Sequence, residues 1–357
     1  MNEINDFIEI SKYAGERFDL VQAAGGNSSV KIKDNEEMLI KASGFLLSDI
    51  KKNIGYSTVL TKSIADIVNN EEIVTSRNKR ERELLASSLL KKSTLDTFNR
   101  PSIETLLHSL LLKYTLHTHP IVVNMIVSRK NSKDLLTDIF KDEEIAFVHY
   151  ETPGIDLAIA LNKELKKFKK IPKIIFLQNH GLIVTSNNKD DIITVTDSSI
   201  KKIEDYLKIN FDKYKLTNSV SFLFDSFETN FNLTYLSEDN YLNEQLNTNK
   251  NLFYEPPFCP DTLVYCGLNP LKINNLIDYS CIKNYVNNKF LLPKVIIFGD
   301  YLLIRAPSIK KAKEIEEVLK FHIMILEQNK NIDLNFLDKE ELNYLSNWEA
   351  EKYRQKL

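Results

Sequence analysis

Runs of apolar residues separated by polar turns predict the elements of the first part of the chain. Over residues 2–18 apolar side chains recur at helical spacing and indicate an amphipathic helix. The runs 30–33 and 38–41 flank the turn Asp34-Asn35 and predict a β-hairpin. The same reasoning predicts helices over 79–92, 103–112, 121–128, 155–168 and 188–208, and strands over 114–119, 145–148, 173–177 and 182–185. Together they predict a three-layer α/β/α domain, residues 1–212, whose central sheet is mainly antiparallel.

The pattern changes after residue 212. Residues 213–250 are polar and rich in Asn, Thr, Ser and Leu, so we expect a linker there. Residues 251–357 then predict a smaller α/β extension. Its expected elements are strands at 294–298 and 301–305, a helix at 308–327 and helical turns through Trp348.

Composition and charge narrow the classes of function. The chain has 357 residues, of which 43% are hydrophobic and 27% charged, with a net charge of −2. Lysine and arginine are spread evenly, which argues against nucleic-acid and membrane-surface partners. No apolar run approaches the ~18 residues of a membrane span, and the amino terminus lacks a signal-peptide pattern. The three cysteines have no close metal spacing. We therefore expect a cytoplasmic protein.

Histidine spacing supplies the first candidate chemistry. His117 and His119 stand two apart in a predicted strand, so both imidazoles point to one face. His180 lies where another apolar strand meets a glycine, and Glu104 begins a predicted helix. Three imidazoles and a carboxylate suit a catalytic zinc, which needs an open position and a proton carrier. The His-x-His pair alone also fits hydrogen-bonded core histidines.

Glycine and hydroxyl residues supply the second candidate. Only nine glycines occur, and Gly25-Gly26-Asn27-Ser28-Ser29 and Ser43-Gly44 form polar turns at strand ends. Ser102 is a further hydroxyl at a predicted helix start. Backbone N–H groups and small hydroxyls at such places suit a phosphate oxygen, although a plain turn and a plain helix cap fit equally. No nucleotide-binding motif is present.

The motifs occur together in one order across residues 1–210. They are Gly25-Gly-Asn-Ser-Ser-Val-Lys31, Lys41-Ala-Ser-Gly44, Pro101-Ser-Ile-Glu104, His117-Thr-His-Pro120, Tyr150-Glu-Thr-Pro-Gly154 and Asn179-His-Gly-Leu182. With them the chain resembles the class II aldolase/adducin family, which includes fuculose-1-phosphate and rhamnulose-1-phosphate aldolases and ribulose-5-phosphate 4-epimerase. It is most similar to the aldolase half of the bifunctional rhamnulose-1-phosphate aldolase/alcohol dehydrogenases. The resemblance implies a class II aldolase-like fold.

The resemblance also implies roles for individual residues. His117, His119 and His180 would bind one zinc ion per subunit, and Glu104 would be the catalytic acid and base. The substrate phosphate would be held by Asn27, Ser43, Gly44 and Ser102. Ile103 departs from the Ser-Ser-Glu wording of many sugar-phosphate aldolases and removes one phosphate hydroxyl. A homo-oligomer, with a tetramer favoured, is implied as well.

The function implied is a zinc-dependent aldolase acting on a ketose 1-phosphate. It would cleave or form the bond between dihydroxyacetone phosphate and an aldehyde through an enediolate. A 4-epimerase or a sugar-acid-phosphate decarboxylase could use the same site. A non-enzymatic adducin-like scaffold is the third alternative, but a scaffold needs neither three ligands nor a base. His108, one turn after Glu104, could orient that carboxylate, although a structural role is favoured.

Overall fold

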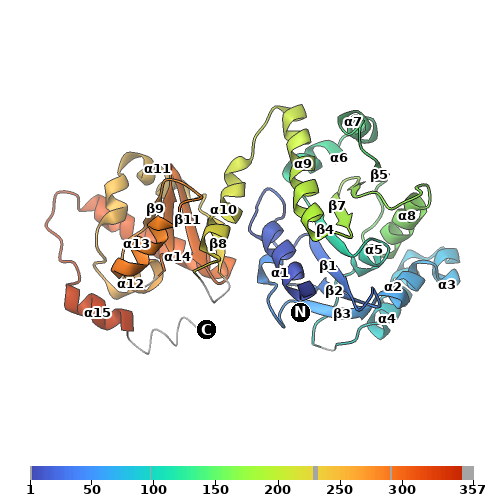
Figure 1. Cartoon of the computed structure of the whole chain (residues 1–357), viewed down its shortest axis with the longest axis horizontal. Helices are drawn as coiled ribbons and strands as arrows, with labels where there is room; N and C mark the ends of the chain where they lie inside the picture. The colour runs from blue at the N-terminus through green and yellow to red at the C-terminus, as the bar shows by residue number, and fades with distance from the viewer. Residues whose placement is uncertain (1, 97, 228–231, 290–291, 348–357) are drawn as a thin grey trace. The chain divides into compact units, whose positions relative to one another are not determined.

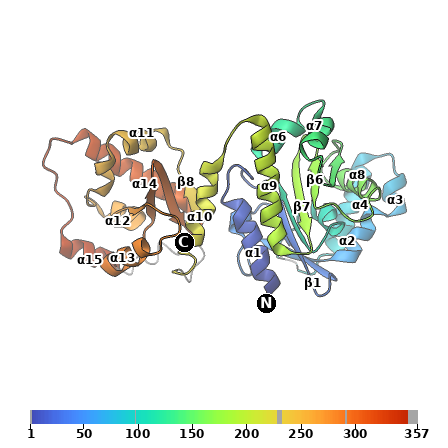
Figure 2. The same cartoon turned by 45° about the horizontal axis from the view of Figure 1, so that its top comes forward.

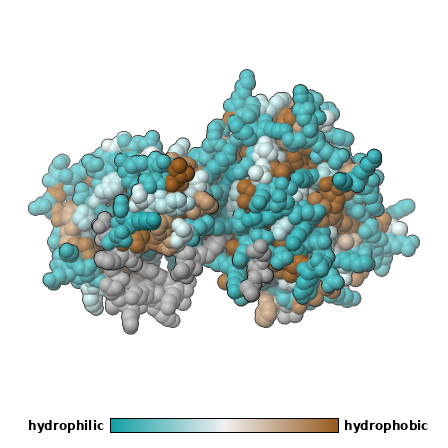
Figure 3. All heavy atoms as spheres, viewed as in Figure 1, coloured by the Kyte–Doolittle hydropathy of each residue, from teal (hydrophilic) through white to brown (hydrophobic). Residues whose placement is uncertain are grey.

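The computed structural model describes residues 2–96, 98–227, 232–289 and 292–347. The chain divides into two compact units, Met1–Asp212 and Lys213–Leu357 (Figure 1). Within the described ranges, no helix has the length and apolar character that crossing a membrane requires. Polar side chains cover most of the surface seen in Figure 3, and apolar side chains are scattered among them.

A seven-stranded sheet forms the centre of the first unit. Its strands are β1 (Asn27–Ile32), β2 (Glu37–Lys41), β3 (Tyr56–Leu60), β4 (Tyr114–Thr118), β5 (Ile145–Val148), β6 (Ile174–Leu177) and β7 (Gly181–Ser186). Their order is β3-β2-β1-β4-β7-β6-β5, and β5 and β6 are the parallel pair while the other neighbours are antiparallel. The mainly antiparallel sheet expected from the sequence is therefore confirmed, with β3 as an edge strand that was not predicted.

Helices surround this sheet. They are α1 (Asn2–Gly15), α2 (Thr61–Val68), α3 (Glu71–Thr75), α4 (Lys79–Lys92), α5 (Thr105–Ser109), α6 (Ile121–Val127), α7 (Ser132–Ile139), α8 (Ile155–Leu165) and α9 (Lys189–Leu207), with a short 3-10 turn, η1, at Leu47–Asp49. The helix expected over 103–112 is only α5, because Lys31 Nζ donates to the carbonyls of Ser109 and Leu111 and the chain turns there into β4. Three helices, α2, α3 and α7, were not predicted.

Alternate strand residues enter two separate apolar cores. Val30, Leu116 and Val184 belong to the core that contains residues of α1, α6 and α9. Ile175 and Ile183 belong to the other core, with residues of α2, α4, α5 and α8. Figure 2 shows these two groups of helices on opposite sides of the sheet. Each fully buried Val, Leu or Ile contributes about 1.5–3 kcal/mol to the free energy of folding, so both faces stabilise the sheet that carries the site.

The second unit has its own four-stranded sheet, in the order β8-β11-β10-β9. The strands are β8 (Leu233–Leu236), β9 (Leu271–Ile273), β10 (Val295–Phe298) and β11 (Tyr301–Ala306). The helices are η2 (Asp212–Tyr214), α10 (Lys215–Phe224), α11 (Asn240–Thr248), η3 (Lys250–Tyr254), α12 (Pro260–Cys266), α13 (Ser280–Lys289), α14 (Ile309–Gln328) and α15 (Lys339–Asn347). The predicted helical turns through Trp348 end outside the described residues.

The prediction of a linker over residues 213–250 is wrong for the described part of that segment. It contains α10, β8 and α11. Leu223, Leu233 and Leu242 from these elements are fully buried. Some of the polar residues that suggested a linker are buried as well. The hydroxyls of Ser221 and Thr234, for example, form a buried hydrogen bond of 2.7 Å.

Candidate metal centre

Four side chains from separate parts of the first unit converge on one point. Nε2 of His117 lies 3.0 Å from Nε2 of His119 and 3.3 Å from Nε2 of His180. Oε1 of Glu104 lies 3.3 Å from Nε2 of His117 and 3.4 Å from Nε2 of His180. All four potential ligand atoms lie within 4.8 Å of one another. The geometry therefore places three nitrogens and one oxygen where a single cation could contact them.

The sheet and its turns position these groups. His117 lies in β4 opposite Ile183, while His119 follows the end of that strand. His180 precedes Gly181, the first residue of β7, and the neighbouring Asn179 adopts a left-handed φ of 54°. A Cβ on Gly181 would lie 2.2 Å from the carbonyl oxygen of Thr118, so only glycine allows β7 to approach β4 this closely. This contact brings His180 beside the other two histidines.

A hydrogen bond fixes the ring of His117. Its Nδ1 lies 3.0 Å from the carbonyl oxygen of Leu182. A carbonyl can only accept, so Nδ1 carries the proton and Nε2 presents its lone pair to the centre. Histidine ligands of metals are commonly oriented by such a carbonyl.

The charges of the group also suit a cation. Burial, together with His117 and His180, lowers the pKa of His119 to about 3, so this imidazole is neutral at pH 7. Burial alone would raise the pKa of Glu104, but the adjacent His117 and His180 lower it well below its usual value. Imidazole nitrogens and a carboxylate oxygen are the ligand types that zinc sites use. The residues present therefore fit a divalent metal.

The residues expected to hold phosphate lie at three places in the chain: Asn27 is the first residue of β1, Ser43 and Gly44 follow the end of β2, and Ser102 precedes Glu104 by two residues. Asn27 begins β1 directly opposite His117 and is fully buried, and neither its amide nitrogen nor its oxygen has a hydrogen-bond partner among the described residues. The Ser43 amide donates to the Arg100 carbonyl, which brings it close to the segment that carries Ser102. Gly44 has a φ of +88° and open space where a Cβ would lie. Exposed backbone and an unpartnered amide at such places suit a polar ligand.

Ser102 and Ile103 lie directly before Glu104 in the chain. Ile103 is 40% exposed, and its Cδ1 lies 3.0 Å from the position of a Cβ on Gly154, so it contacts the loop after β5. The Ser102 hydroxyl accepts from the Glu104 amide at 3.3 Å, which orders the start of α5. Glu104 itself occupies the N-cap position of α5 rather than its first turn.

Sequence reasoning missed Lys41. This lysine is 3% exposed at the end of β2, and its Nζ donates to the Ala24 carbonyl at 3.2 Å. Burial lowers the pKa of Lys41, while the negative charge of Glu104 opposes that change, so the ammonium lies within electrostatic reach of the centre. The signal in the sequence was a charged residue ending an apolar strand just before Ser43-Gly44.

His108 has the structural environment that was favoured for it. It is fully buried, and its Nδ1 lies 2.7 Å from the hydroxyl of Ser29. Burial lowers the pKa of His108 to about 3, so it is neutral. The pair holds α5 against β1.

A family model described as the class II aldolase and adducin N-terminal domain matches residues 5–198. The chain belongs to this family. The resemblance drawn from the sequence motifs is thus confirmed at the level of the family, and the match lies within the first unit. No curated protein matches the chain.

Solved structures with similarity to the chain include three proteins from microbes. The N-terminal class II aldolase domain of a conserved protein from Thermoplasma acidophilum is 23% identical, with a TM-score of 0.47, covering 57% of this chain and 93% of that one. An L-fuculose-1-phosphate aldolase from Thermus thermophilus is 14% identical, with a TM-score of 0.37 and coverages of 58% and 94%. A sugar-phosphate aldolase from Thermotoga maritima is 14% identical, with a TM-score of 0.42 and coverages of 58% and 94%.

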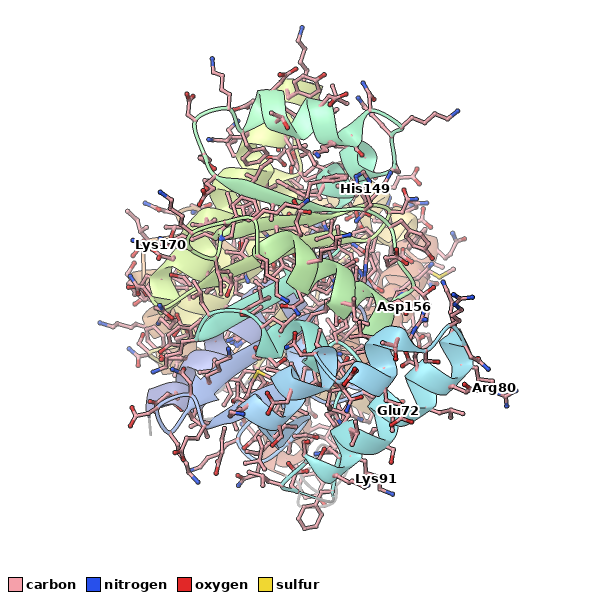
Figure 4. The ribbon with its side chains drawn as sticks, turned by 90° about the vertical axis from the view of Figure 1, so that its right-hand side faces the viewer. Glu72, Arg80, Lys91, His149, Asp156 and Lys170 are labelled. Atoms are coloured by element: carbon pink, nitrogen blue, oxygen red, sulfur yellow. The ribbon has the colours of Figure 1, made fainter. Side chains whose placement is uncertain are left out.

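His149 is not among the four side chains that converge in this protein. It is exposed, and its Nδ1 lies 3.1 Å from Oε1 of Gln178. With Arg82, Asp156 and Lys163 it lines a cavity of about 460 Å³ between α4 and α8, on the face shown in Figure 4. The lining of this cavity includes none of the four groups. His149 therefore has no part in the metal centre.

Proposed function

We propose that the first unit is a zinc-dependent aldolase that cleaves or forms a ketose 1-phosphate. The observation that carries this proposal is the convergence of three imidazole Nε2 atoms and the ionised Glu104 carboxylate on one point. When bound there by His117, His119 and His180, zinc would supply a positive charge that stabilises an enediolate. The sequence motif around Glu104 is similar to that of the bifunctional rhamnulose-1-phosphate aldolases, and this similarity supports the choice of substrate class.

Glu104 has the position and charge of the acid and base. In the synthetic direction its carboxylate takes a proton from the hydroxymethyl carbon of dihydroxyacetone phosphate. That carbon then bonds to the aldehyde carbon, the aldehyde oxygen takes up a proton from water, and protonated Glu104 releases its proton to water. In cleavage the substrate hydroxyl gives its proton to water as the carbon–carbon bond breaks, and Glu104, having taken a proton from water, delivers it to the enediolate carbon. The adjacent His117 and His180 lower the pKa of Glu104 against the effect of burial, so the carboxylate is ionised and has a lone pair that can accept a proton.

The phosphate of the substrate would lie among Asn27, Ser43, Gly44 and Ser102. The side-chain amide of Asn27, which has no hydrogen-bond partner among the described residues, supports this placement. A buried polar group without a partner lowers the stability of the fold by about 1–3 kcal/mol, and a hydrogen bond to the ligand would recover this cost. Lys41 would add a positive charge near the phosphate. We also expect a homo-oligomer, with a tetramer favoured, and a cytoplasmic location.

Metal content and turnover test the proposal together. Plasma mass spectrometry of the purified protein should give about one zinc per chain, and His119→Ala should lose it. The metal-loaded protein should then condense dihydroxyacetone phosphate with at least one of a panel of aldehydes. Epimerisation of a pentulose 5-phosphate, or loss of carbon dioxide from a sugar-acid phosphate, without condensation would replace the aldolase by that alternative. No metal in either protein after zinc is added would favour the scaffold.

A further inference from the structure

The backbone of His119 is held from outside the sheet. His117 is in β4, and His180 directly precedes β7, whereas β4 ends at Thr118. Beyond the end of β4 the backbone is held by the segment that follows α1, since the amide of His119 donates to the carbonyl oxygen of Leu20 at 2.9 Å. The amide of Ile121 donates to the carbonyl of Asp19, also at 2.9 Å. The position of His119 thus depends on residues 19 and 20.

Gly25, in the same segment, packs against the His119 ring. The approach is so close that a Cβ added to Gly25 would lie only 2.9 Å from Nδ1 of His119. Residues 19–25 therefore hold His119 both through its backbone and through its imidazole. Any shift of this segment would move one of the three nitrogens of the metal centre.

Arg17 fixes this segment from inside the protein. Its side chain is 1% exposed, and its guanidinium donates to both carboxylate oxygens of Asp19, at 3.1 Å from Nε and 2.6 Å from Nη2. Nη1 donates to the Asp197 carboxylate of α9 at 2.6 Å and to the Tyr13 hydroxyl at 3.1 Å. The Tyr13 hydroxyl in turn donates to Asp197 at 2.8 Å. One planar cation therefore ties Asp19 to both α1 and α9.

We propose that Arg17 is a positioning residue of the metal centre, acting on His119 through Asp19 and Leu20. The inference rests on the proposed metal site. A lysine could keep the charge but could not span two carboxylates, because its single ammonium lacks the planar fork of guanidinium. Loss of groups that orient a metal ligand typically weakens metal binding by about 10–100-fold.

The test compares Arg17→Lys with a matched control in the full chain. Lys189→Ala is the control, because Lys189 pairs with Glu9 at 2.8 Å and joins the same two helices without touching residues 17–21. Zinc affinity is measured by competition with a chromophoric chelator, at a temperature where circular dichroism shows every variant folded. Hydrogen exchange of residues 117–121 is followed by mass spectrometry.

Arg17→Lys should weaken zinc binding by about 10–100-fold and speed exchange at His119, while Lys189→Ala changes neither. If Arg17→Lys does not fold, Asp197→Asn, which leaves the Arg17–Asp19 pair intact, should show both effects to a smaller degree. Wild-type zinc affinity and exchange in the variants that fold would overturn the inference. If the wild-type protein binds no zinc, the proposed function fails, but the exchange at His119 still tests the role of Arg17.

Discussion

Two opposing effects set the pKa of the Glu104 carboxyl group. It is largely buried, which favours the neutral form, yet the adjacent histidines lower its pKa well below the usual value. The carboxylate is therefore ionised and can accept a proton.

Replacing this carboxylate by an amide tests that role. Glu104→Gln keeps the shape but removes the base, so turnover should fall by about 10²–10⁴-fold. Zinc should remain near one per chain, because His117, His119 and His180 are unchanged. Glu83→Gln is the control, because that carboxylate lies beside Gly154 and outside the converging group. Equal turnover in the two variants would remove Glu104 from the mechanism.

A buried histidine in the second unit predicts acid sensitivity there. His322 is 3% exposed and stacks on Phe258, with ring centroids 5.1 Å apart. Burial lowers the pKa of His322 to about 4, against the opposing effect of a hydrogen bond with the Glu255 backbone. Between pH 6.5 and pH 4 the unfolded chain therefore binds a proton that the folded chain does not, and stability falls as the pH falls.

His322→Phe should reduce this loss. One pKa unit corresponds to about 1.4 kcal/mol, and the unfolded histidine is already half protonated at pH 6.5, so from pH 6.5 to pH 5 His322 should account for about 1.5 kcal/mol of lost stability. Denaturant unfolding of the wild type and of His322→Phe at both pH values measures the difference. Phenylalanine keeps the ring stack on Phe258, which limits other changes. Parallel losses in the two proteins would show that His322 does not titrate in this range.

At the scale of elements, the turn at Gly181 decides whether two ligand-bearing segments meet. Ala at this position would place its Cβ 2.2 Å from the Thr118 carbonyl and 3.2 Å from His119 Cδ2. Gly181→Ala should therefore lower stability by about 1–3 kcal/mol through overpacking and also reduce zinc content. Gly299→Ala is the control: it has a φ of +59° and open space, so it should cost stability by about 1–2 kcal/mol with full zinc retained. Calorimetry and metal analysis separate the two effects.

The apolar pattern of the sequence predicted some strands and helices correctly and missed others. Strands such as β6 and β7 are continuous apolar runs, and the hairpin β1–β2 has a polar turn, so periodicity located them. The edge strand β3 was missed because its polar residues are buried by tertiary contacts, as when the Ser57 hydroxyl donates to the Asn99 carbonyl at 2.8 Å. α5 was predicted too long because Lys31, remote in sequence, takes up the carbonyls at its end.

The site depends on contacts between segments that are far apart in the sequence, which no local sequence pattern contains. His117 and His180 are 63 positions apart and meet because β4 and β7 are neighbours in the sheet. Their shared chemistry could be inferred from residue types and from the family motifs. The contribution of residues 17–20 could not, because an arginine and an aspartate two apart are ordinary in a surface turn, and only the fold buries them.

The apolar cores of the two units share no residues, which predicts that the first unit folds without the second. The two cores of that unit draw on residues up to Phe211, while the core of the second unit begins at Tyr235. All four converging groups lie in residues 1–212. A protein consisting of residues 1–212 should therefore unfold cooperatively and bind about one zinc. Calorimetry and metal analysis, with His119→Ala in the same shortened chain as control, measure both properties. A shortened chain that is folded but binds no zinc, beside a full chain that does, would mean that residues 213–357 contribute to the centre.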